Sequence, residues 1–337
     1  MTTFDPVGKR VLLIALPGYP KGIIRQMQEM GIDVDYINDK PNDGFLCKTL
    51  GRLQIPFYLK VIDRYYDRKI EALKHRHYDY ILVIRGEYTT KGALLRLKEA
   101  FPKAKRILYM WDGLHKQNTK GIEKKWQYYD KVFTFDRIDF LAHQNEICFL
   151  PLFYYNEYLP KNIKPCDDPN LLYDASFIGT GHTDRVKVVK EVMRQCEKGF
   201  KRTFSYVFMP HPLVFWENKL FNKNFKDVKK SDVHFQSLPF ETLYQTYAES
   251  KCVVDVENPG QHGLTMRSIE ILGLKRKFIT TNPDIIHYDF YHPNNILVID
   301  RSHPIVDLSF FDTPYHTLPA EIYEKYSLEH WIRQVLS

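Results

Sequence analysis

The first half of the chain alternates short apolar runs with segments whose apolar residues recur every three or four positions. Such runs predict strands at 11–16, 34–37, 78–84, 106–110, 131–135 and 146–150. Helical spacing predicts helices around 23–30, 58–74 and 90–100. Because strands that alternate with helices build a parallel sheet, this half predicts a Rossmann-like domain.

A second alternation begins after a stretch rich in turn residues between 151 and 174. Predicted strands lie at 173–178, 203–208, 252–256 and 277–280, with helices at 185–197, 240–249 and 265–272. The pattern predicts an α/β fold of two Rossmann-like domains with a cleft between them. The expected divisions are 1–155, a linker at 156–172, 173–318, and a C-terminal helical segment at 319–337 that crosses back to the first domain.

Size and composition agree with two globular domains. A chain of 337 residues exceeds the size at which one hydrophobic core stops growing, and 44% hydrophobic with 26% charged residues is ordinary for a globular protein. The net charge of +7 suits an anionic partner, such as a nucleotide diphosphate, a nucleic acid or an acidic membrane. No zinc-finger, KH or RRM signature accompanies the basic clusters at 103–106, 124–125 and 226–230, so we interpret these as solvated surface and expect no nucleic-acid partner.

Several reaction classes and locations lack their sequence signals. The five cysteines form no Cys-x-x-Cys pair, and the chain contains neither a Gly-x-Ser-x-Gly elbow nor a Walker A loop. No signal-peptide pattern and no run of roughly 20 apolar residues occurs, so we expect a cytoplasmic protein, with peripheral contact to the inner membrane or a biosynthesis complex as a possible addition. Histidines at 211, 287 and 292 lack metal-ligand spacing, and no bound metal is expected.

Two segments follow predicted strands of the second half and contain glycines before a helix. In the first, Gly179, Thr180 and Gly181 lead to Arg185. Free N–H groups and the positive end of a helix dipole favour a phosphate there, although many such turns bind nothing. In the second, a loop with two glycines precedes an amphipathic helix in which Arg267 and Glu270 are neighbours, an arrangement equally compatible with a surface ion pair.

The second segment, Gly263-Leu-Thr-Met-Arg-Ser-Ile-Glu270-Ile-Leu-Gly, with the following Lys277-Phe-Ile-Thr-Thr-Asn282, resembles the donor site of GT-B glycosyltransferases, especially the CgeB-like and the capsule or O-antigen enzymes. Further similar stretches are Tyr109-Met-Trp-Asp112-Gly, Phe135-Asp-Arg, Leu150-Pro-Leu-Phe-Tyr and Ser176-Phe-Ile-Gly179. Together they span about half of the chain. The resemblance implies a GT-B fold, with the acceptor bound by the first domain and a nucleotide-sugar by the second.

The resemblance also implies roles for individual residues. Glu270 would hold the ribose hydroxyls, because a carboxylate can accept two of them. Many retaining relatives carry a second Glu eight positions earlier, where this chain has His262, so the stereochemistry stays open. The donor site would comprise Gly179, Thr180, Gly181, Arg185, Gly263, Leu264, Thr265, Arg267 and Glu270, with Lys275 and Arg276 as weaker candidates for charge stabilisation.

Two carboxylates in the first half follow predicted strands and could act as a general base toward an acceptor hydroxyl. They are Glu87 and Asp112, and both could instead serve only to cap the following helices. We favour Asp112 slightly, and count His262 with them as a catalytic candidate.

The expected function is transfer of a sugar from a UDP-, GDP-, CMP- or dTDP-sugar to a hydroxyl of a surface glycan or a lipid-linked glycan, without a permanently bound cofactor. Two alternatives remain from the sequence. One is a non-catalytic nucleotide-sugar-binding protein of a glycan assembly complex, and the other is a two-domain nucleotide-sugar epimerase.

Overall fold

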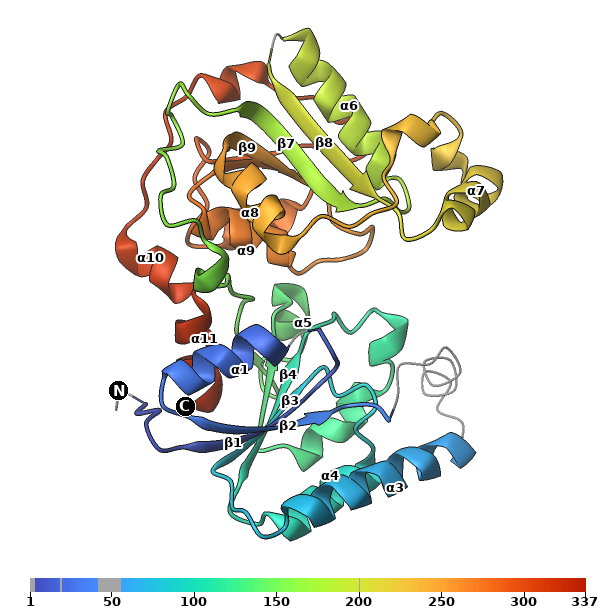
Figure 1. Cartoon of the computed structure of the whole chain (residues 1–337), viewed down its shortest axis with the longest axis vertical. Helices are drawn as coiled ribbons and strands as arrows, with labels where there is room; N and C mark the ends of the chain where they lie inside the picture. The colour runs from blue at the N-terminus through green and yellow to red at the C-terminus, as the bar shows by residue number, and fades with distance from the viewer. Residues whose placement is uncertain (1–3, 19, 42–55, 200) are drawn as a thin grey trace. The chain divides into compact units, whose positions relative to one another are not determined.

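The computed structural model describes residues 4–18, 20–41, 56–199 and 201–337, and Figure 1 shows its course. The chain divides into two compact units. The first comprises Met1–Pro151 together with Leu328–Ser337, and the second comprises Leu152–Ser327. Each unit contains one parallel β-sheet with helices packed on its faces, and each is described here by itself.

The sheet of the first unit has six parallel strands in the order β2-β1-β3-β4-β5-β6. Their bounds are β1 Arg10–Ala15, β2 Asp33–Asn38, β3 Tyr80–Ile84, β4 Lys105–Met110, β5 Lys131–Thr134 and β6 Cys148–Phe149. The central strands β1 and β3 are almost completely buried along their lengths. Burial on both faces explains why these strands appear in the sequence as continuous apolar runs instead of alternating ones.

Two helices of the first unit, α4 Lys91–Ala100 and α5 Arg137–Ala142, begin at residues whose side chains cap them. Further helices are α1 Pro20–Glu29 and α3 Pro56–Leu73, with short 3-10 helices η1 Gln117–Thr119 and η2 Ile122–Tyr128. The Thr90 hydroxyl caps α4, and the Asp136 carboxylate caps α5 by accepting from two backbone N–H groups. The last helix of the chain, α11 Leu328–Leu336, packs against α1 and β4. Its Trp331 is 1% exposed and meets Tyr109 edge to face, with ring centroids 4.8 Å apart.

The sheet of the second unit has five parallel strands in the order β11-β10-β9-β7-β8. Their bounds are β7 Tyr173–Thr180, β8 Thr203–Phe208, β9 Ser250–Asp255, β10 Lys277–Thr280 and β11 Ile296–Val298. The helices are α6 Arg185–Lys198, α7 Pro212–Phe221, α8 Phe240–Ala248, α9 Met266–Gly273 and α10 Ala320–Lys325. The 3-10 helices are η3 Asn156–Tyr158, η4 Lys223–Phe225, η5 Lys230–Asp232, η6 Pro283–His287 and η7 Leu308–Phe311.

The strand order places a switch point in each sheet. The chain passes from β1 to β2 on one side and to β3 on the other, and likewise from β7 to β8 on one side and to β9 on the other. In open α/β sheets, ligands bind outside the carboxyl ends of the strands at such a point. The fold therefore directs attention to the ends of β7 and β9, from which the predicted donor segments start.

The observed α/β architecture of two parallel sheets confirms the predicted fold class. Among the described α-helices and strands, α5, α7 and β11 were not predicted. The segment at 319–337 forms two helices, α10 and α11, because the chain turns at Tyr326 and Ser327. Within the described residues, no helix combines the length and apolar character that crossing a membrane would require.

Candidate functional site

The turn after β7 is shaped by close packing as well as by the glycines. Gly179 and Thr180 are the last residues of β7, so the strand extends two residues beyond its predicted end. A Cβ on Gly179 would lie 2.7 Å from Nη2 of Arg267 and 2.8 Å from the Phe177 ring. A Cβ on Gly181 would lie 2.7 Å from Val207. The need for glycine at both positions thus follows from neighbouring side chains, without invoking a ligand.

Thr183 gives this turn a strained backbone. Its φ is +52°, in the left-handed region that β-branched residues rarely adopt. The Thr183 carbonyl accepts a hydrogen bond from Nδ2 of Asn222 at 3.0 Å, which helps to hold the conformation. Strain of this kind persists where the surroundings enforce it, and it is concentrated at ligand-binding turns.

Arg185, the first residue of α6, is a buried cation that forms no ion pair with any described residue. It is 8% exposed, and its guanidinium donates from Nη1 to the Thr180 carbonyl at 3.1 Å. Nε has no partner in the described part of the chain. Burial lowers the pKa of Arg185 to about 10, the charges of Arg267 and Arg301 act in the same direction, and the carboxylates of Asp255 and Glu257 oppose them. A buried guanidinium that no carboxylate contacts directly is costly unless an anion joins it.

The pKa of His182 is lowered by burial and by the same positive surroundings. Burial, followed by the charges of Arg185 and Arg301, lowers the pKa of His182 to about 4. The imidazole is therefore neutral near pH 7 and can donate or accept a hydrogen bond beside Arg185.

Arg267 lies inside the unit and does not form a surface pair with Glu270. Its Nη1 bonds to Oδ1 of Asp255 at 3.0 Å, and its Nε donates to the Tyr247 hydroxyl at 3.1 Å. Its guanidinium also covers the Phe177 ring, 5.4 Å from the centroid. Of the two interpretations that the sequence left open for these residues, a surface ion pair between Arg267 and Glu270 is not formed, because Arg267 pairs with the buried Asp255 at the end of β9.

Asp255 organises the start of α9. Its Oδ2 accepts hydrogen bonds from Thr265 at 2.7 Å and from the Ser268 hydroxyl at 2.5 Å. Thr265 is the N-cap of α9 and not its first residue, with Oγ1 accepting from the Ser268 N–H at 3.1 Å. Leu264, 2% exposed, anchors the preceding loop in the core. The start of the donor-type segment is therefore held in place by Asp255 and by the burial of Leu264.

Glu270 lies one turn further along α9, partly accessible and without an ion pair among the described residues. Burial raises its pKa, against the opposing effects of the Tyr244 hydroxyl and the Arg267 guanidinium. A partly accessible carboxylate is well suited to accept hydroxyl donors from a ligand.

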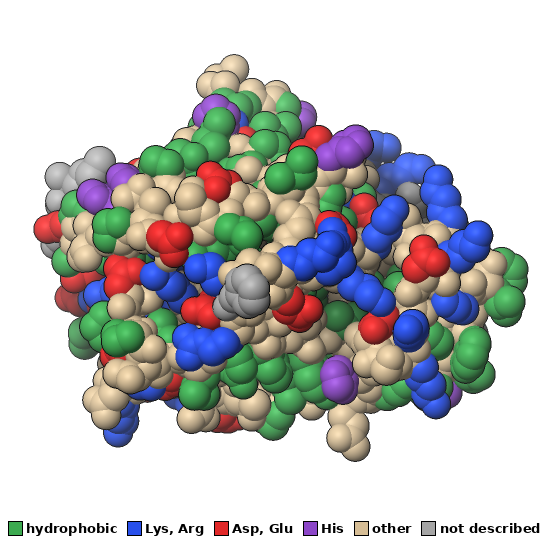
Figure 2. All heavy atoms as spheres, turned by 90° about the horizontal axis from the view of Figure 1, so that it is seen from above, with side chains coloured by type: hydrophobic (Ala, Val, Ile, Leu, Met, Phe, Trp, Pro, Cys, Tyr) green, Lys and Arg blue, Asp and Glu red, His purple; other side chains and the backbone are tan. Residues whose placement is uncertain are grey.

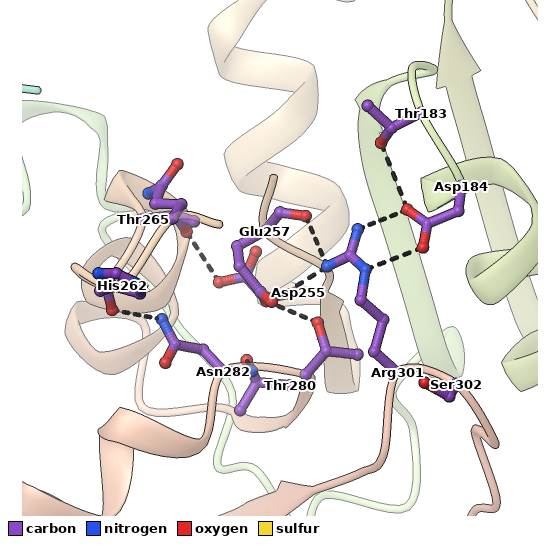
Figure 3. Close-up of polar contacts among 12 residues, drawn as sticks. Thr183, Asp184, Asp255, Glu257, His262, Thr265, Thr280, Asn282, Arg301 and Ser302 are labelled. Atoms are coloured by element: carbon purple, nitrogen blue, oxygen red, sulfur yellow. Dashed lines mark hydrogen bonds and ion pairs between the residues drawn. The ribbon is translucent and has the colours of Figure 1, made fainter. Parts of the chain in front are cut away.

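The network in Figure 3 centres on Arg301, which follows β11 and was missed by the sequence interpretation. Nε and Nη2 of Arg301 bond to both oxygens of Asp184, at 3.0 and 2.6 Å. Nη1 bonds to Oε1 of Glu257 at 3.0 Å, and Oε2 of Glu257 accepts from Thr281 at 2.6 Å. Burial raises the pKa of Glu257 despite the Thr281 hydrogen bond. Arg301 thereby ties the ends of three strands together.

His262 and Gly263 belong to the loop between β9 and α9. The His262 side chain is exposed, and its carbonyl accepts from Nδ2 of Asn282 at 2.9 Å, as Figure 3 shows. The Gly263 carbonyl accepts from Nε2 of Gln261 at 3.1 Å. Among the weaker candidates, Arg276 is buried and donates to the Lys164 carbonyl, so its role is structural, while Lys275 covers the Tyr323 ring.

In the first unit, one arginine joins both predicted carboxylates. Nη2 of Arg85 lies 3.1 Å from Oε2 of Glu87 and 2.9 Å from Oδ2 of Asp112. Asp112 also accepts from Lys116 at 3.3 Å and from Asn118 at 2.9 Å. Arg85 adopts a left-handed φ of +72° at the end of β3, a conformation that directs its side chain at strain cost.

Glu87 additionally lines a cavity of about 390 Å³ at the carboxyl edge of the first sheet. The walls are apolar and aromatic residues of α3, η2 and the turn after β3, with three lysines at 91, 124 and 125. Burial lowers the pKa of Lys125, whose Nζ donates to the Gly86 carbonyl at 3.0 Å. Asp112 does not line this cavity, so the geometry distinguishes the two carboxylates.

Comparisons with known proteins support the fold and leave the finer identity open. No protein-family model and no curated protein matches the chain. Among solved structures, the Anabaena protein HepE in complex with UDP and glucose is similar with a TM-score of 0.59 and 10% identity, over 96% of this chain and 97% of that one. UDP-GlcNAc 2-epimerase from Methanocaldococcus jannaschii has a TM-score of 0.56 and 11% identity, over 97% and 99%.

A third similar structure is sucrose-phosphate synthase from Thermosynechococcus elongatus, with a TM-score of 0.54 and 12% identity over 97% of this chain and 94% of that one. At these identities the likeness shows the fold alone. The resemblance to CgeB-like and capsule enzymes is not confirmed by these neighbours. The two sheets and the coverage of whole neighbours show that the chain has the GT-B fold.

Proposed function

We propose that the protein is a glycosyltransferase that moves a sugar from a nucleotide-sugar donor to a hydroxyl of a surface glycan, such as a capsule, an O-antigen or a lipid-linked precursor. The observation that carries the proposal is Arg185, a buried guanidinium at the switch point of the second sheet that forms no ion pair within the described part of the chain. A diphosphate there would pair with this guanidinium and accept from backbone N–H groups at the start of α6.

The donor would lie along the ends of β7 and β9. Its phosphates would meet the Gly179–Thr183 turn and Arg185, and its ribose hydroxyls would bond to Glu270. Cleavage of the sugar–phosphate bond places negative charge on the leaving phosphate, and Arg185 is oriented in advance to stabilise it. Arg267 contributes by holding this turn in shape, since Asp255 already neutralises it.

The acceptor hydroxyl would be activated by Glu87 in preference to Asp112. Asp112 accepts from Arg85, Lys116 and Asn118, and these bonds occupy both of its carboxylate oxygens. Glu87 lines the cavity of the first unit, where an acceptor could enter. His262 stays a candidate for a role near the reacting sugar, because its side chain is exposed on the loop before α9.

Two alternative functions keep the same donor site. Nucleotide-sugar epimerases are among the similar structures, so isomerisation of the donor without any acceptor is the first alternative. A non-catalytic nucleotide-sugar-binding protein is the second. Among the similar structures, HepE is complexed with UDP or UDP-glucose, and a starch synthase is complexed with ADP. A screen should therefore begin with UDP- and ADP-sugars and then continue with GDP-, CMP- and dTDP-sugars.

The test is a thermal-shift screen over these nucleotide-sugars, followed by calorimetry of the best ligand. A ligand that binds only the native state at 100 times its Kd stabilises that state by about 2.7 kcal/mol. We expect Arg185→Gln to weaken donor binding at least tenfold, and Lys198→Gln, at the exposed end of the same helix, to leave it unchanged. Failure of every nucleotide-sugar to stabilise the wild type would refute the proposal.

Incubation of the bound donor then separates the three functions. A transferase releases nucleotide and free sugar slowly without acceptor, an epimerase converts the donor to its isomer, and a binding protein returns the donor unchanged. The proposal also places the protein in the cytoplasm, where it would act without a permanently bound cofactor.

A further inference from the structure

Helix α7 displays an apolar face that the described residues of the second unit leave exposed. Of its residues only Phe215 is buried, at 2% exposure, within the core of the unit. Four large apolar side chains remain highly exposed: Leu213 70%, Trp216 53%, Leu220 77% and Phe221 84%. Positions three, seven and eight residues after the first share one side of a helix, so the four form a continuous stripe opposite Phe215.

A run of exposed lysines follows the helix directly. Lys223, Lys226, Lys229 and Lys230 are exposed and form no ion pair with any described residue. Asp227 is the single acid between 222 and 230. This basic segment, 223–230, includes the cluster at 226–230 that the sequence suggested was ordinary solvated surface.

The helix and the basic segment are held together as one structure. Nζ of Lys219, in the last turn of α7, donates to the carbonyls of Phe225 at 3.1 Å and of Val228 at 2.8 Å. Asn222 caps η4 by accepting from the Asn224 N–H at 3.0 Å. In Figure 1 α7 projects from the side of the second unit, and in Figure 2 basic side chains gather on that side, with hydrophobic ones at its outer edge.

We propose that α7 and the basic segment bind the surface of a bilayer that contains anionic phospholipid. Apolar and aromatic side chains of an amphipathic helix insert at the boundary between headgroups and acyl chains, and adjacent lysines are attracted to the anionic surface. Tryptophan prefers this boundary. The lysine run identifies the occupant by charge, since four unpaired cations beside the stripe match a negative surface. This proposal goes beyond sugar transfer and does not depend on it.

The test is co-sedimentation of the full chain with vesicles of pure phosphatidylcholine or of phosphatidylcholine with 30% phosphatidylglycerol, a fraction chosen to give a strongly anionic surface. We expect binding to the anionic vesicles, weakened by 0.5 M salt because screening shortens the reach of the lysine charges. Leu213→Ser with Leu220→Ser should lower the partition coefficient at least tenfold. Lys226→Gln with Lys229→Gln and Lys230→Gln should have a comparable effect.

Matched variants control for loss of apolar area and charge elsewhere. Leu172→Ser with Ile305→Ser removes two side chains of the same unit that are 56% and 74% exposed, and should leave binding intact. Lys21→Gln with Lys103→Gln and Lys198→Gln removes the same charge as the triple lysine variant of the basic segment, and should also leave binding intact. The thermal midpoint of each variant establishes that it folds.

Three outcomes would overturn the proposal. They are equal binding to neutral and anionic vesicles, undiminished binding by the Leu213/Leu220 variant, and concentration-dependent dimers that this variant abolishes without any vesicle binding by the wild type. The last would assign the stripe to a contact between copies of the chain. None of these measurements uses a nucleotide-sugar, so the result is independent of the proposed function.

Discussion

Arg301 donates to both carboxylate oxygens of Asp184, at 3.0 and 2.6 Å, although 117 positions separate the two residues. The same guanidinium bonds to Glu257, which in turn accepts from Thr281. One side chain therefore fixes the turn after β7 relative to the ends of β9 and β10. The arrangement of the candidate donor site depends on a residue outside both glycine segments.

Replacing Arg301 by Gln should destabilise the protein by about 2–3 kcal/mol, because hydrogen bonds to charged groups are lost and the buried Glu257 is left without this cation. Chemical denaturation measures this change, and calorimetry should show weaker donor binding. Arg202→Gln is the control, since Arg202 is exposed and its pair with Asp174 should contribute less than about 1 kcal/mol. Equal effects of the two substitutions would contradict the structural role given to Arg301.

Replacing Glu270 by Ala should raise the donor KM at least tenfold while kcat changes little, because the ribose contact exists in the ground state and the transition state alike. Calorimetry with the donor measures the binding loss directly. Glu241→Ala, an exposed acid at the start of α8, should leave donor affinity unchanged. Unchanged affinity in the Glu270 variant would remove this residue from the donor site.

Replacing Glu87 by Gln should lower kcat by about 100-fold or more, the usual range for loss of a general base, with donor KM unaltered. Asp112→Asn should have a smaller effect, because that carboxylate already accepts from three donors. Steady-state kinetics with a working acceptor compares the two variants, and Glu123→Gln, at the exposed start of η2, is the control. A larger loss from Asp112→Asn would reverse the assignment.

The low pKa of His182, about 4, predicts that stability depends on pH. Between pH 4 and the ordinary pKa near 6.5, the unfolded chain binds a proton at His182 and the native protein does not. The free energy of unfolding is therefore unaffected by this group above about pH 6.5 and decreases as pH falls toward 4. His182→Gln should flatten the pH dependence of the free energy of unfolding in this window. His303→Gln, at a highly exposed position, should not. Urea titrations at pH 4.5, 5.5 and 7.0, chosen to bracket the window, test this expectation.

The order of strands and helices could be predicted from the sequence. The central strands are continuous apolar runs, and the helices have apolar residues at helical spacing. The strand at Ile296–Val298 could not be predicted, since three residues carry no measurable periodicity. Helix α7 was missed for another reason: its apolar residues face outward, and Phe215 is its only buried residue, so no core-facing stripe marks it.

The candidate site was predictable only where it depends on local sequence. The glycines and Arg185 follow a strand and precede a helix, which is a local pattern. The pairing of Arg267 with Asp255 could not be predicted, because Asp255 lies on the preceding strand and helical spacing relates only residues of the same helix.

The return of α11 to the first unit has a consequence for how the two units can be separated. The second unit is one uninterrupted segment, Leu152–Ser327, inserted between two parts of the first. Its ends are adjacent, because Tyr154 pairs with Ser327 in a parallel bridge and the Tyr154 N–H bonds to the Tyr326 carbonyl at 2.9 Å. The inserted segment can therefore be excised as a continuous gene fragment, whereas the first unit needs its C-terminal helix rejoined by a short linker after Pro151.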